Sequence, residues 1–509
     1  MNHLPNWNKP GSFSAGRDPL GLQAASVRLY TDLLPGLTNV TNRLRYFSFY
    51  CWVVRQFELR RHSSVERIWS LFIRRAEAAY VLASHYGDDE YAFGMAGSIW
   101  AGRHSALDRA LDFRPWTDQP GEDDQYLKAR FGNFGQFYIA SMQQVGMLQE
   151  SPLRVQAVKE GLGLDLAEAF EDACPTACKE LLRAIDSGTI GPKDCKAISD
   201  EAHPAYLDDS EELRLLVEYL CGDRVEDPTA PARRATLWNV LNIVDRTGIV
   251  DPSELRRELY VQDNIGVVTE GTLAENLIGW RAYFVNELCH VTLELLLNAL
   301  TYRINAAGPR RPDELTRDLV SKGLGADSNT SLSLLEFASE RSLTTLEEEH
   351  IAGLRLSQAV GTKADPSDPL LAIAIDLLLS LWDRWGADPG VEAALKPATI
   401  SGRSALGVFR FLDSLADQPA PDVLVSLTRK FVVSNHLLIA GQKLAAAGTY
   451  TYRFIVDEAT LVDGLAAEYG FTNPRIGNLL TFAEDAGLVT EGELTPAGKT
   501  FLRANQPVR

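Results

Sequence analysis

Apolar residues recur with helical spacing along most of the chain. The segment 273–304 is apolar on nearly every face, as Leu293, Leu296 and Leu300 illustrate, and a helix of this kind is expected to be buried on all sides. Other segments carry a single apolar stripe, which is typical of a helix with one buried face. The pattern predicts a mainly α-helical protein, with further helices at 27–34, 43–61, 63–84, 91–111, 131–146, 161–172, 313–322, 331–359, 367–386, 404–416 and 421–447.

Proline and glycine divide this pattern into segments. The stretch GPRRP at 308–312 interrupts the central helix and is the clearest predicted boundary. A chain of 509 residues exceeds the size at which a single core stops growing, so several domains are expected. The predicted division is an irregular arm at 1–26, an N-terminal helical domain at 27–172, a central helical domain at 173–308, a C-terminal helical domain at 309–447 and a final domain at 448–509.

The final domain has the most specific pattern. Asn473 is suited to cap a helix whose first position is Pro474. Apolar residues then recur at 476, 479, 480 and 483, and Gly487 provides a left-handed stop. A tight turn at 490–493 and a second helix start at Thr495-Pro496 follow. The pattern predicts helix, β-hairpin and helix, preceded by another short helix at 459–469.

This C-terminal arrangement resembles a winged helix-turn-helix module. The sequence AGLV at 486–489, followed by LTPAG at 494–498, is similar to the wing region of many prokaryotic winged-helix proteins. The resemblance covers about 457–505, a tenth of the chain, and it implies a fold without implying a ligand. The order of helix, glycine, short extended piece and helix recurs at 125–172, where we expect a second, similar element.

In a DNA-binding winged helix, the exposed face of the second helix reads the bases. The residues expected on that face here are Thr472, Arg475, Asn478 and Thr481. Between residues 457 and 509, however, three arginines and one lysine stand against eight acidic residues, a net charge of −4. Because duplex binding draws much of its affinity from neutralised phosphates, the sequence leaves open whether this module binds DNA or a protein.

A basic concentration lies in the two helices predicted at 43–61 and 63–84. Arginine interleaved with aromatic residues is suited to hold phosphates or an acidic partner. Alternatively, the arginine stems cover an aromatic core and pair with acids from elsewhere. The candidate binding residues are Arg43, Arg45, Arg55, Arg60, Arg61, Arg74 and Arg75, with Arg67 and His62 beside them.

The formal net charge of −18 argues against broad binding to nucleic acid or anionic membranes. The six cysteines include no C-x-x-C pair, so reduced thiols in a cytoplasmic protein are expected. Residues 1–20 lack the apolar core of a signal peptide. The apolar run at 370–382 contains Asp376 and is too short to span a bilayer.

Glu287, His290 and Glu294 form the strongest catalytic candidate, because their spacing places them on one face of the central helix. Carboxylate-bridged metal sites in helix bundles use such an arrangement. Glu347 and His350 repeat part of the pattern, although Glu347 belongs to an acidic run. A buried histidine with a satisfied hydrogen bond is the simpler explanation, and no motif for phosphate, nucleotide or nucleophilic catalysis occurs. No cofactor is therefore predicted, and catalysis is not favoured.

These features favour a non-catalytic adaptor or scaffold subunit of a prokaryotic complex acting on nucleic acid, for example in genome maintenance or phage defence. Its partners are expected to be proteins of a multi-subunit complex, with DNA as a further candidate and no membrane. One alternative is a sequence-specific DNA-binding regulator that reads bases through Arg475. The other is a helical-bundle metal enzyme centred on Glu287 and His290.

Overall fold

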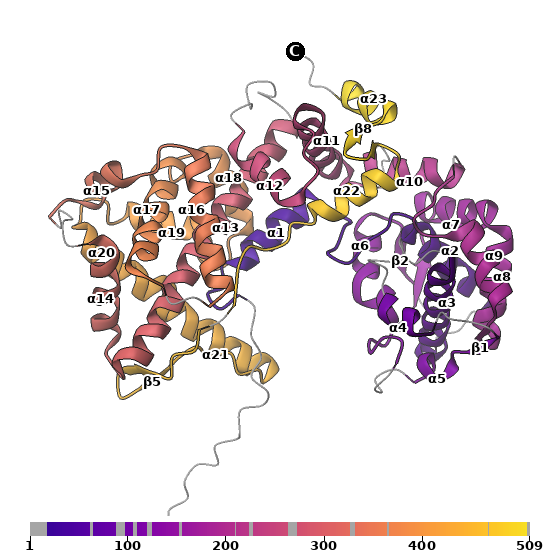
Figure 1. The fold of residues 1–509 in the computed structure, drawn as a ribbon, viewed down its shortest axis with the longest axis horizontal. Helices are drawn as coiled ribbons and strands as arrows, with labels where there is room; N and C mark the ends of the chain where they lie inside the picture. The colour runs from indigo at the N-terminus through magenta and orange to yellow at the C-terminus, as the bar shows by residue number, and fades with distance from the viewer. Residues whose placement is uncertain are drawn as a thin grey trace, which may run out of the picture. The chain divides into compact units, whose positions relative to one another are not determined.

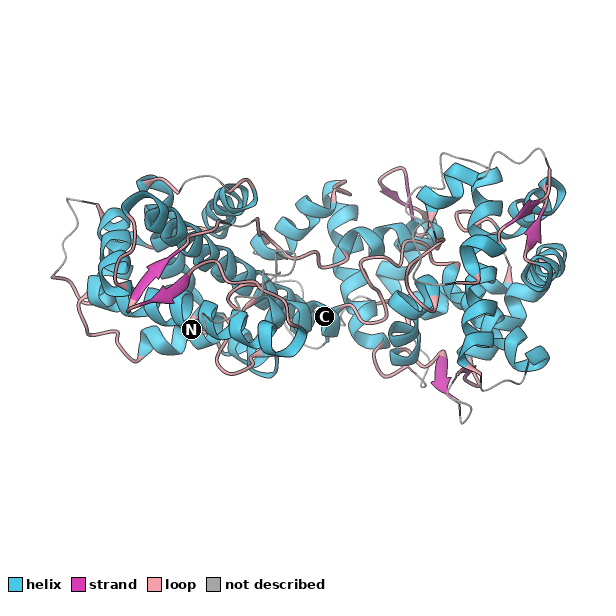
Figure 2. Cartoon of the chain, turned by 90° about the horizontal axis from the view of Figure 1, so that it is seen from below, coloured by secondary structure: helices cyan, strands magenta, loops and turns pink. Residues whose placement is uncertain are grey.

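The computed structural model of the chain is mainly α-helical, as the sequence predicts (Figure 1). Strands occur among the described residues as two-stranded antiparallel pairs (Figure 2). The chain divides into two compact units, each built from separate stretches of sequence. The structure describes residues 18–61, 65–87, 97–104, 109–119, 125–151, 155–208, 210–222, 227–262, 272–325, 331–363, 366–466 and 468–505.

Unit 1 comprises residues 1–30, 257–269 and 277–473. Its elements are α13 (Thr272–Ala307, from residue 277 onward), α14 (Pro312–Leu324), α15 (Leu334–Arg341), α16 (Leu346–Gly361), α17 (Asp368–Trp385), α18 (Pro389–Ala398), α19 (Ala405–Asp413), α20 (Ala420–Leu427), the π-helix η3 (Thr428–Ser434), α21 (Asn435–Ala447), β5 (Ile455–Asp457) and β6 (Thr460–Val462).

Unit 2 comprises residues 31–256, 270–276 and 474–509. The helices α1 (Gln23–Leu33) and α12 (Pro252–Val261) contribute to both units. The elements of unit 2 are α2 (Tyr46–Arg61), α3 (Glu66–Gly87), α4 (Ser98–His104), β1 (Leu111–Asp112), α5 (Arg114–Thr117), the π-helix η1 (Phe134–Tyr138), α6 (Ile139–Gln144), β2 (Leu148–Glu150), β3 (Gln156–Val158), α7 (Leu162–Ala173), α8 (Pro175–Ser187), β4 (Thr189–Ile190), α9 (Pro192–Ala202), α10 (Glu211–Cys221), α11 (Ala230–Thr247), α22 (Ile476–Asp485), β7 (Val489–Thr490), β8 (Glu493–Leu494) and α23 (Pro496–Ala504).

The compact units differ from the five consecutive ranges expected from the sequence. Residues 448–473 belong to unit 1 and residues 474–509 to unit 2, so the predicted final domain is divided. Within residues 474–505, β8 and α23 pack against α11 of the N-terminal half of the chain. The predicted ranges were divided at proline and glycine residues. Packing between distant segments is not marked by such residues, so the predicted ranges and the compact units differ.

The central helix is confirmed. α13 is buried on nearly all faces, with Leu293, Leu297 and Leu300 fully covered. The sequence DPSE at 251–254 predicts a helix start, because an aspartate cap is followed by proline at the first helical position and glutamate at the third. The structure confirms this start, because the Asp251 carboxylate accepts the main-chain N–H groups of Ser253 and Glu254.

Several predicted helices were wrong in extent. The helix expected at 331–359 is two helices, α15 and α16, and each begins with its own capping box, at Ser333 and Thr345. Within the helix expected at 91–111, residues 91–96 and 105–108 lie outside the described residues. The remainder contains only the short α4 before Leu111 pairs with Ile190 in the β1–β4 ladder. The helix α18 was not predicted.

The helix predicted at 459–469 was also wrong. Its first residues form the turn and the second strand of the β5–β6 hairpin, and the chain then runs without helix through a segment that we call the strap (residues 463–466 and 468–473). Asp463 has a φ of 60°, and a Cβ at Gly464 would lie 2.2 Å from the carbonyl oxygen of Thr301. The left-handed backbone and the close approach to α13 both exclude a helix here.

One helical stretch among the described residues, Ala420–Ala447, is long and apolar enough to cross a membrane by length and composition alone. In the structure, 61% of the most apolar 18-residue part of this stretch is buried within the protein. Core helices of soluble proteins meet the same criterion, and the packing of α20 against α14 and α15 is of that kind.

Candidate functional site

The predicted arrangement of helix, hairpin and helix is present at the end of the chain. We call α22, β7, β8 and α23 the C-terminal module. Val489 pairs with Leu494 in the hairpin. The Thr495 hydroxyl then accepts the main-chain N–H of Gly498 and caps α23. Asn473, however, does not occupy the cap position of α22: the helix is preceded by Arg475 in a left-handed conformation, with a φ of 69°.

A second set of elements in the same order lies within 125–172, where the sequence echoes the C-terminal pattern. We call η1, α6, β2, β3 and α7 the N-terminal module. At the end of α6, the main-chain N–H of Met147 donates to the carbonyl of Met142, at 2.9 Å. The Met147 carbonyl in turn accepts the N–H of Lys159 beyond the hairpin, at 3.0 Å.

The C-terminal module repeats these two hydrogen bonds. Leu488 takes the place of Met147: its N–H donates to Ala483 at 2.8 Å, and its carbonyl accepts from Thr495 at 3.1 Å. A left-handed glycine precedes each of the two residues, Gly146 with a φ of 76° and Gly487 with a φ of 68°. The modules therefore share a main-chain geometry, although their sequences have few identities.

A close helix contact is also common to the two modules. A Cβ at Gly163 in α7 would lie 2.1 Å from the Met147 carbonyl oxygen, and a Cβ at Gly498 in α23 would lie 2.2 Å from that of Leu488. Each module also has a long helix behind it. α2 packs on α7 and β3, while α11 packs on α23 and β8.

Residues 35–44, which we call the connector segment, contact helices of both modules within unit 2. On the N-terminal module, the Gly36 carbonyl accepts from the Ser141 hydroxyl, and the Gly36 N–H donates to Gln144 at 3.3 Å. On the other side, Phe47, just beyond the segment, contacts Tyr138 at 5.7 Å and Phe482 at 5.9 Å between ring centroids. The helices α6 and α22 thus both contact one stretch of chain.

The predicted DNA-reading residues of α22 are engaged by the connector segment. Arg475 donates to the Leu37 carbonyl, and Asn478 donates to the Thr41 carbonyl at 3.0 Å. At the end of the helix, the largely buried Asp485 accepts from Arg43 at 2.7 Å and from the Leu44 N–H at 2.9 Å. This face of α22 is therefore an internal packing face.

The other two predicted readers lie elsewhere. The Thr481 hydroxyl donates to the Gly477 carbonyl of its own helix. Thr472 belongs to the strap in unit 1, where its hydroxyl lies 3.0 Å from that of Tyr283 and its side chain is almost fully covered. The four residues do not form one exposed surface.

Two of the predicted phosphate-binding arginines are buried clamps on the main chain. Arg45 pairs with Glu212 at 2.9 Å and also donates to the carbonyls of His203 and Tyr206. Arg74 has no exposed surface and donates to the carbonyls of Thr117, Leu127 and Ala129. Both belong to the interior, because a guanidinium with five donors can satisfy several buried carbonyls at once.

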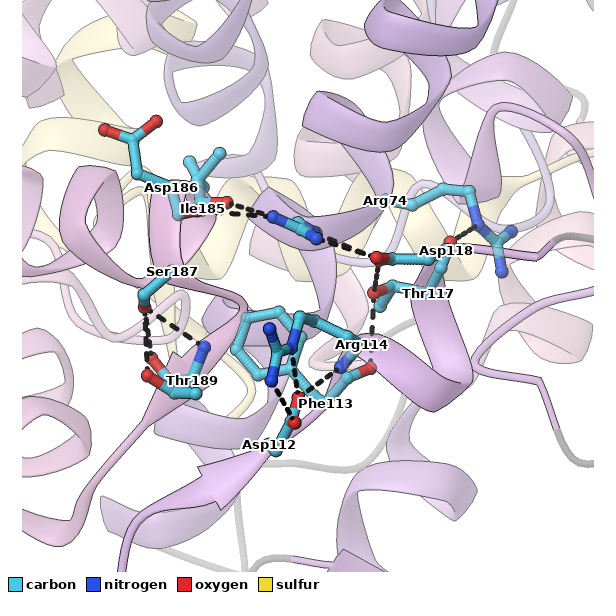
Figure 3. Close-up of polar contacts among 11 residues, drawn as sticks. Arg74, Asp112, Phe113, Arg114, Thr117, Asp118, Ile185, Asp186, Ser187 and Thr189 are labelled. Carbon is cyan, nitrogen blue, oxygen red and sulfur yellow. Dashed lines mark hydrogen bonds and ion pairs between the residues drawn. The ribbon is translucent and has the colours of Figure 1, made fainter.

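The remaining arginines of this set are paired or half-exposed. Arg75 forms an ion pair with Asp118 at 2.7 Å and donates to the carbonyl of Ile185, so it joins α3 to the end of α5 and to α8. Figure 3 shows its two partners, Asp118 and Ile185. Arg55 lies 3.7 Å from Glu58, and Arg60 lies 3.4 Å from Asp186. The side chain of Arg61, like His62, lies outside the described residues.

Glu77 is an important buried residue that the sequence analysis missed. Its carboxylate accepts the main-chain N–H groups of Asn133 and Phe134 and the Tyr50 hydroxyl, and so caps η1 at the start of the N-terminal module. Burial raises the pKa of Glu77 to about 7, against the effect of these hydrogen bonds. Glu77 lies three residues after Arg74 in the buried stripe of α3, and this position in the sequence was the signal that could have indicated its burial.

Glu287, His290 and Glu294 are fully buried on α13. His290 lies between the two carboxylates, with Nε2 2.8 Å from Glu294 and Nδ1 3.8 Å from Glu287. Among the described residues, no group of three or more His, Cys, Asp or Glu side chains is arranged to hold a metal ion. Glu347, from the second predicted motif, instead pairs with Arg257 at 2.6 Å.

The buried cysteines are also unsuited to chemistry. Burial raises the pKa of Cys174, Cys195 and Cys289 to about 12 in each case. These thiols are therefore protonated at neutral pH and are poor nucleophiles.

Comparison with protein-family models, with curated proteins and with solved structures found no match to this chain.

Proposed function

We propose that the protein is a non-catalytic adaptor or scaffold subunit of an intracellular complex acting on nucleic acid, and that its two modules bind a protein partner. The supporting observation is that the side chains of Arg475 and Asn478 donate hydrogen bonds to main-chain carbonyls of the connector segment. Direct base readout requires such donors to reach base edges. A protein partner is therefore better supported than duplex DNA.

The charge distribution supports the same choice. The chain carries a formal net charge of −18, and Arg43, Arg45, Arg74 and Arg75 are engaged by acids or carbonyls of the protein itself. Affinity for nucleic acid depends on arginines and lysines that are available to neutralise phosphates. The link to genome maintenance or phage defence comes only from the resemblance to winged-helix proteins.

The test is reconstitution with a partner that co-purifies stoichiometrically from the native host. Glu493 is exposed on the hairpin of the C-terminal module, so Glu493→Lys is expected to weaken binding of the purified partner at least about tenfold. The matched control is Glu340→Lys, at an exposed position of α15 in unit 1, which should bind as the parent does. Equal behaviour of the two variants would refute a role for the module.

A mobility-shift assay distinguishes the adaptor proposal from the alternative of a DNA-binding regulator. At about 150 mM salt we expect no sequence-specific shift of duplex DNA. A specific shift that Thr481→Glu on α22 abolishes, but Thr500→Glu at an exposed position of α23 does not, would replace the adaptor proposal with a DNA-binding regulator.

A further inference from the structure

The strap lies extended along α13. At one end, Asn305 of α13 donates to the Gly464 carbonyl at 2.7 Å. At the other, the Thr472 N–H donates to the Glu287 carboxylate. The two helix positions are 18 residues apart, about 27 Å along a helix axis. The strap positions are eight residues apart, about 27 Å when fully extended. The strap therefore runs antiparallel to α13 in an extended form.

Three titratable side chains lie on α13 between these two attachment points. Glu287, His290 and Glu294 share one face, and Glu287 touches the strap directly. Glu294 is close enough to Tyr469 of the strap to raise the pKa of that hydroxyl, although burial is the larger cause. One oxygen of Glu294 lies 2.8 Å from His290 Nε2. Within the described part of the chain, the other oxygen of Glu294 and one oxygen of Glu287 have no hydrogen-bond partner. His290 is thus the charge that offsets these carboxylates on α13.

Other elements also bring charged or titratable groups to this region. Arg453, just before β5, donates to the Tyr469 hydroxyl at 2.6 Å, and its main-chain N–H donates to His436 of α21. The helix α16 packs over the strap at Gly353, and its Glu349 is held by Arg384 and the Tyr260 hydroxyl. The groups facing the cluster or packed around it are Asp18, Glu349, His350, His436, Lys443, Arg453 and Tyr469.

We propose that the strap is a latch controlled by protonation. Docking along α13 is tightest when Glu294 and His290 of the cluster formed by Glu287, His290 and Glu294 are both protonated, and each proton that the cluster loses weakens the hold on the strap. Once both protons are lost, two buried carboxylates face a neutral imidazole, and solvation of the freed site is favoured over the closed one. Release frees the chain that leads into α22, so the latch would control the tether of the C-terminal module.

The direction of the pH dependence follows from the shifts of both groups. Burial alone would lower the pKa of His290, but Glu294 and Glu287 outweigh it and raise the pKa from 6.5 to about 9. Burial raises the pKa of Glu294 from 4.5 to about 7 against the effect of His290. In both cases the docked state holds the proton more tightly. Docking is therefore strongest at mildly acidic pH and weakens as pH rises through 7 and toward 9.

Hydrogen exchange of the full chain tests the proposal at two strap amides, Thr472 and Leu465, which donate to Glu287 and to the Arg453 carbonyl. After correction for intrinsic rates, protection should fall at least about tenfold between pH 6 and pH 8.5. Glu294→Gln and, as a second variant, His290→Gln should each reduce this change below about threefold, with folding verified by circular dichroism.

The matched control is Glu77→Gln in unit 2, which removes a buried carboxyl whose pKa is also raised to about 7. The strap of this variant should keep the full pH dependence. The proposal fails if wild-type protection is the same at both pH values, if both α13 variants retain the change, or if Glu77→Gln removes it.

Discussion

At the scale of single residues, this protein uses buried arginines and carboxylates to hold its own main chain. Arg233 has no exposed surface, pairs with Asp227 at 2.6 Å and donates to the Tyr219 carbonyl. Arg74 and Arg45 act similarly. The interpretation of the arginines at 43–75 as an anion-binding surface relied on composition. The position of Arg74 in a stripe with Ile73 and Glu77, all buried, indicates an internal role instead.

Glu77 gives a prediction for pH dependence. Because its pKa in the folded state is about 7 and its ordinary value is 4.5, the stability from this group is fully present below about pH 4.5 and lost as pH rises through 7. The free energy of unfolding of unit 2 should fall between pH 5 and pH 7.5 in the wild-type protein. In Glu77→Gln this fall should be smaller than in the wild type by on the order of 3 kcal/mol. Urea unfolding measures this, and an unchanged decrease would contradict it.

At the scale of elements, the two modules share main-chain hydrogen bonds rather than sequence. The turn after the first helix, the hairpin closure and the close helix contact recur around Met147 and Leu488. Glycine is needed at positions of two kinds, a left-handed turn and a helix that touches a carbonyl. The sequence revealed the first kind, because Gly146 and Gly487 follow an apolar stripe. The helical glycines have no such local signal.

The helical glycines are a test of the shared geometry. Gly163→Ala and Gly498→Ala would each place a Cβ within 2.2 Å of a carbonyl oxygen. Each should lower the free energy of unfolding of unit 2 by about 1–3 kcal/mol through overpacking. The control is Gly102→Ala in α4, where the nearest atom would be 3.8 Å away and alanine should be neutral or slightly stabilising. Equal effects at all three positions would refute the assignment.

At the scale of the whole molecule, both units depend on segments that are far apart in the sequence. In unit 2, the Trp238 indole of α11 donates to the Leu502 carbonyl of α23 at 3.1 Å, and Arg43 pairs with Asp485. The C-terminal module is therefore part of the unit 2 core. The range 448–509, which the sequence assigns to one domain, is divided between the two compact units after residue 473.

A truncation after Asn473 tests this dependence. It removes the C-terminal module and exposes Trp238, which is 4% exposed in the full chain. Amide protection in α11 should fall at least about a hundredfold, which corresponds to about 3 kcal/mol, while protection of α13 in unit 1 is retained. Removal of residues 506–509 alone is the control and should change neither. Retained protection of α11 in the longer truncation would show that the module is dispensable for unit 2.

Local patterns in the sequence were sufficient for most elements. The buried α13, the Asp251 cap and the final hairpin with its two helices follow from apolar spacing, capping residues and glycine positions, all of which act within a few residues. The same reasoning failed at 459–469, where a good helical pattern is overridden by contacts with α13.

The sequence by itself determined that this chain is helical, where its longest core helix lies and where two similar modules occur. Tertiary structure decided which charged side chains remain available. Arg475 and Arg74 are candidates for a binding surface when only their neighbours in sequence are known, and each bonds to main chain more than 40 positions away. A hydrogen bond between distant segments depends on how the whole chain folds, so no local pattern encodes it.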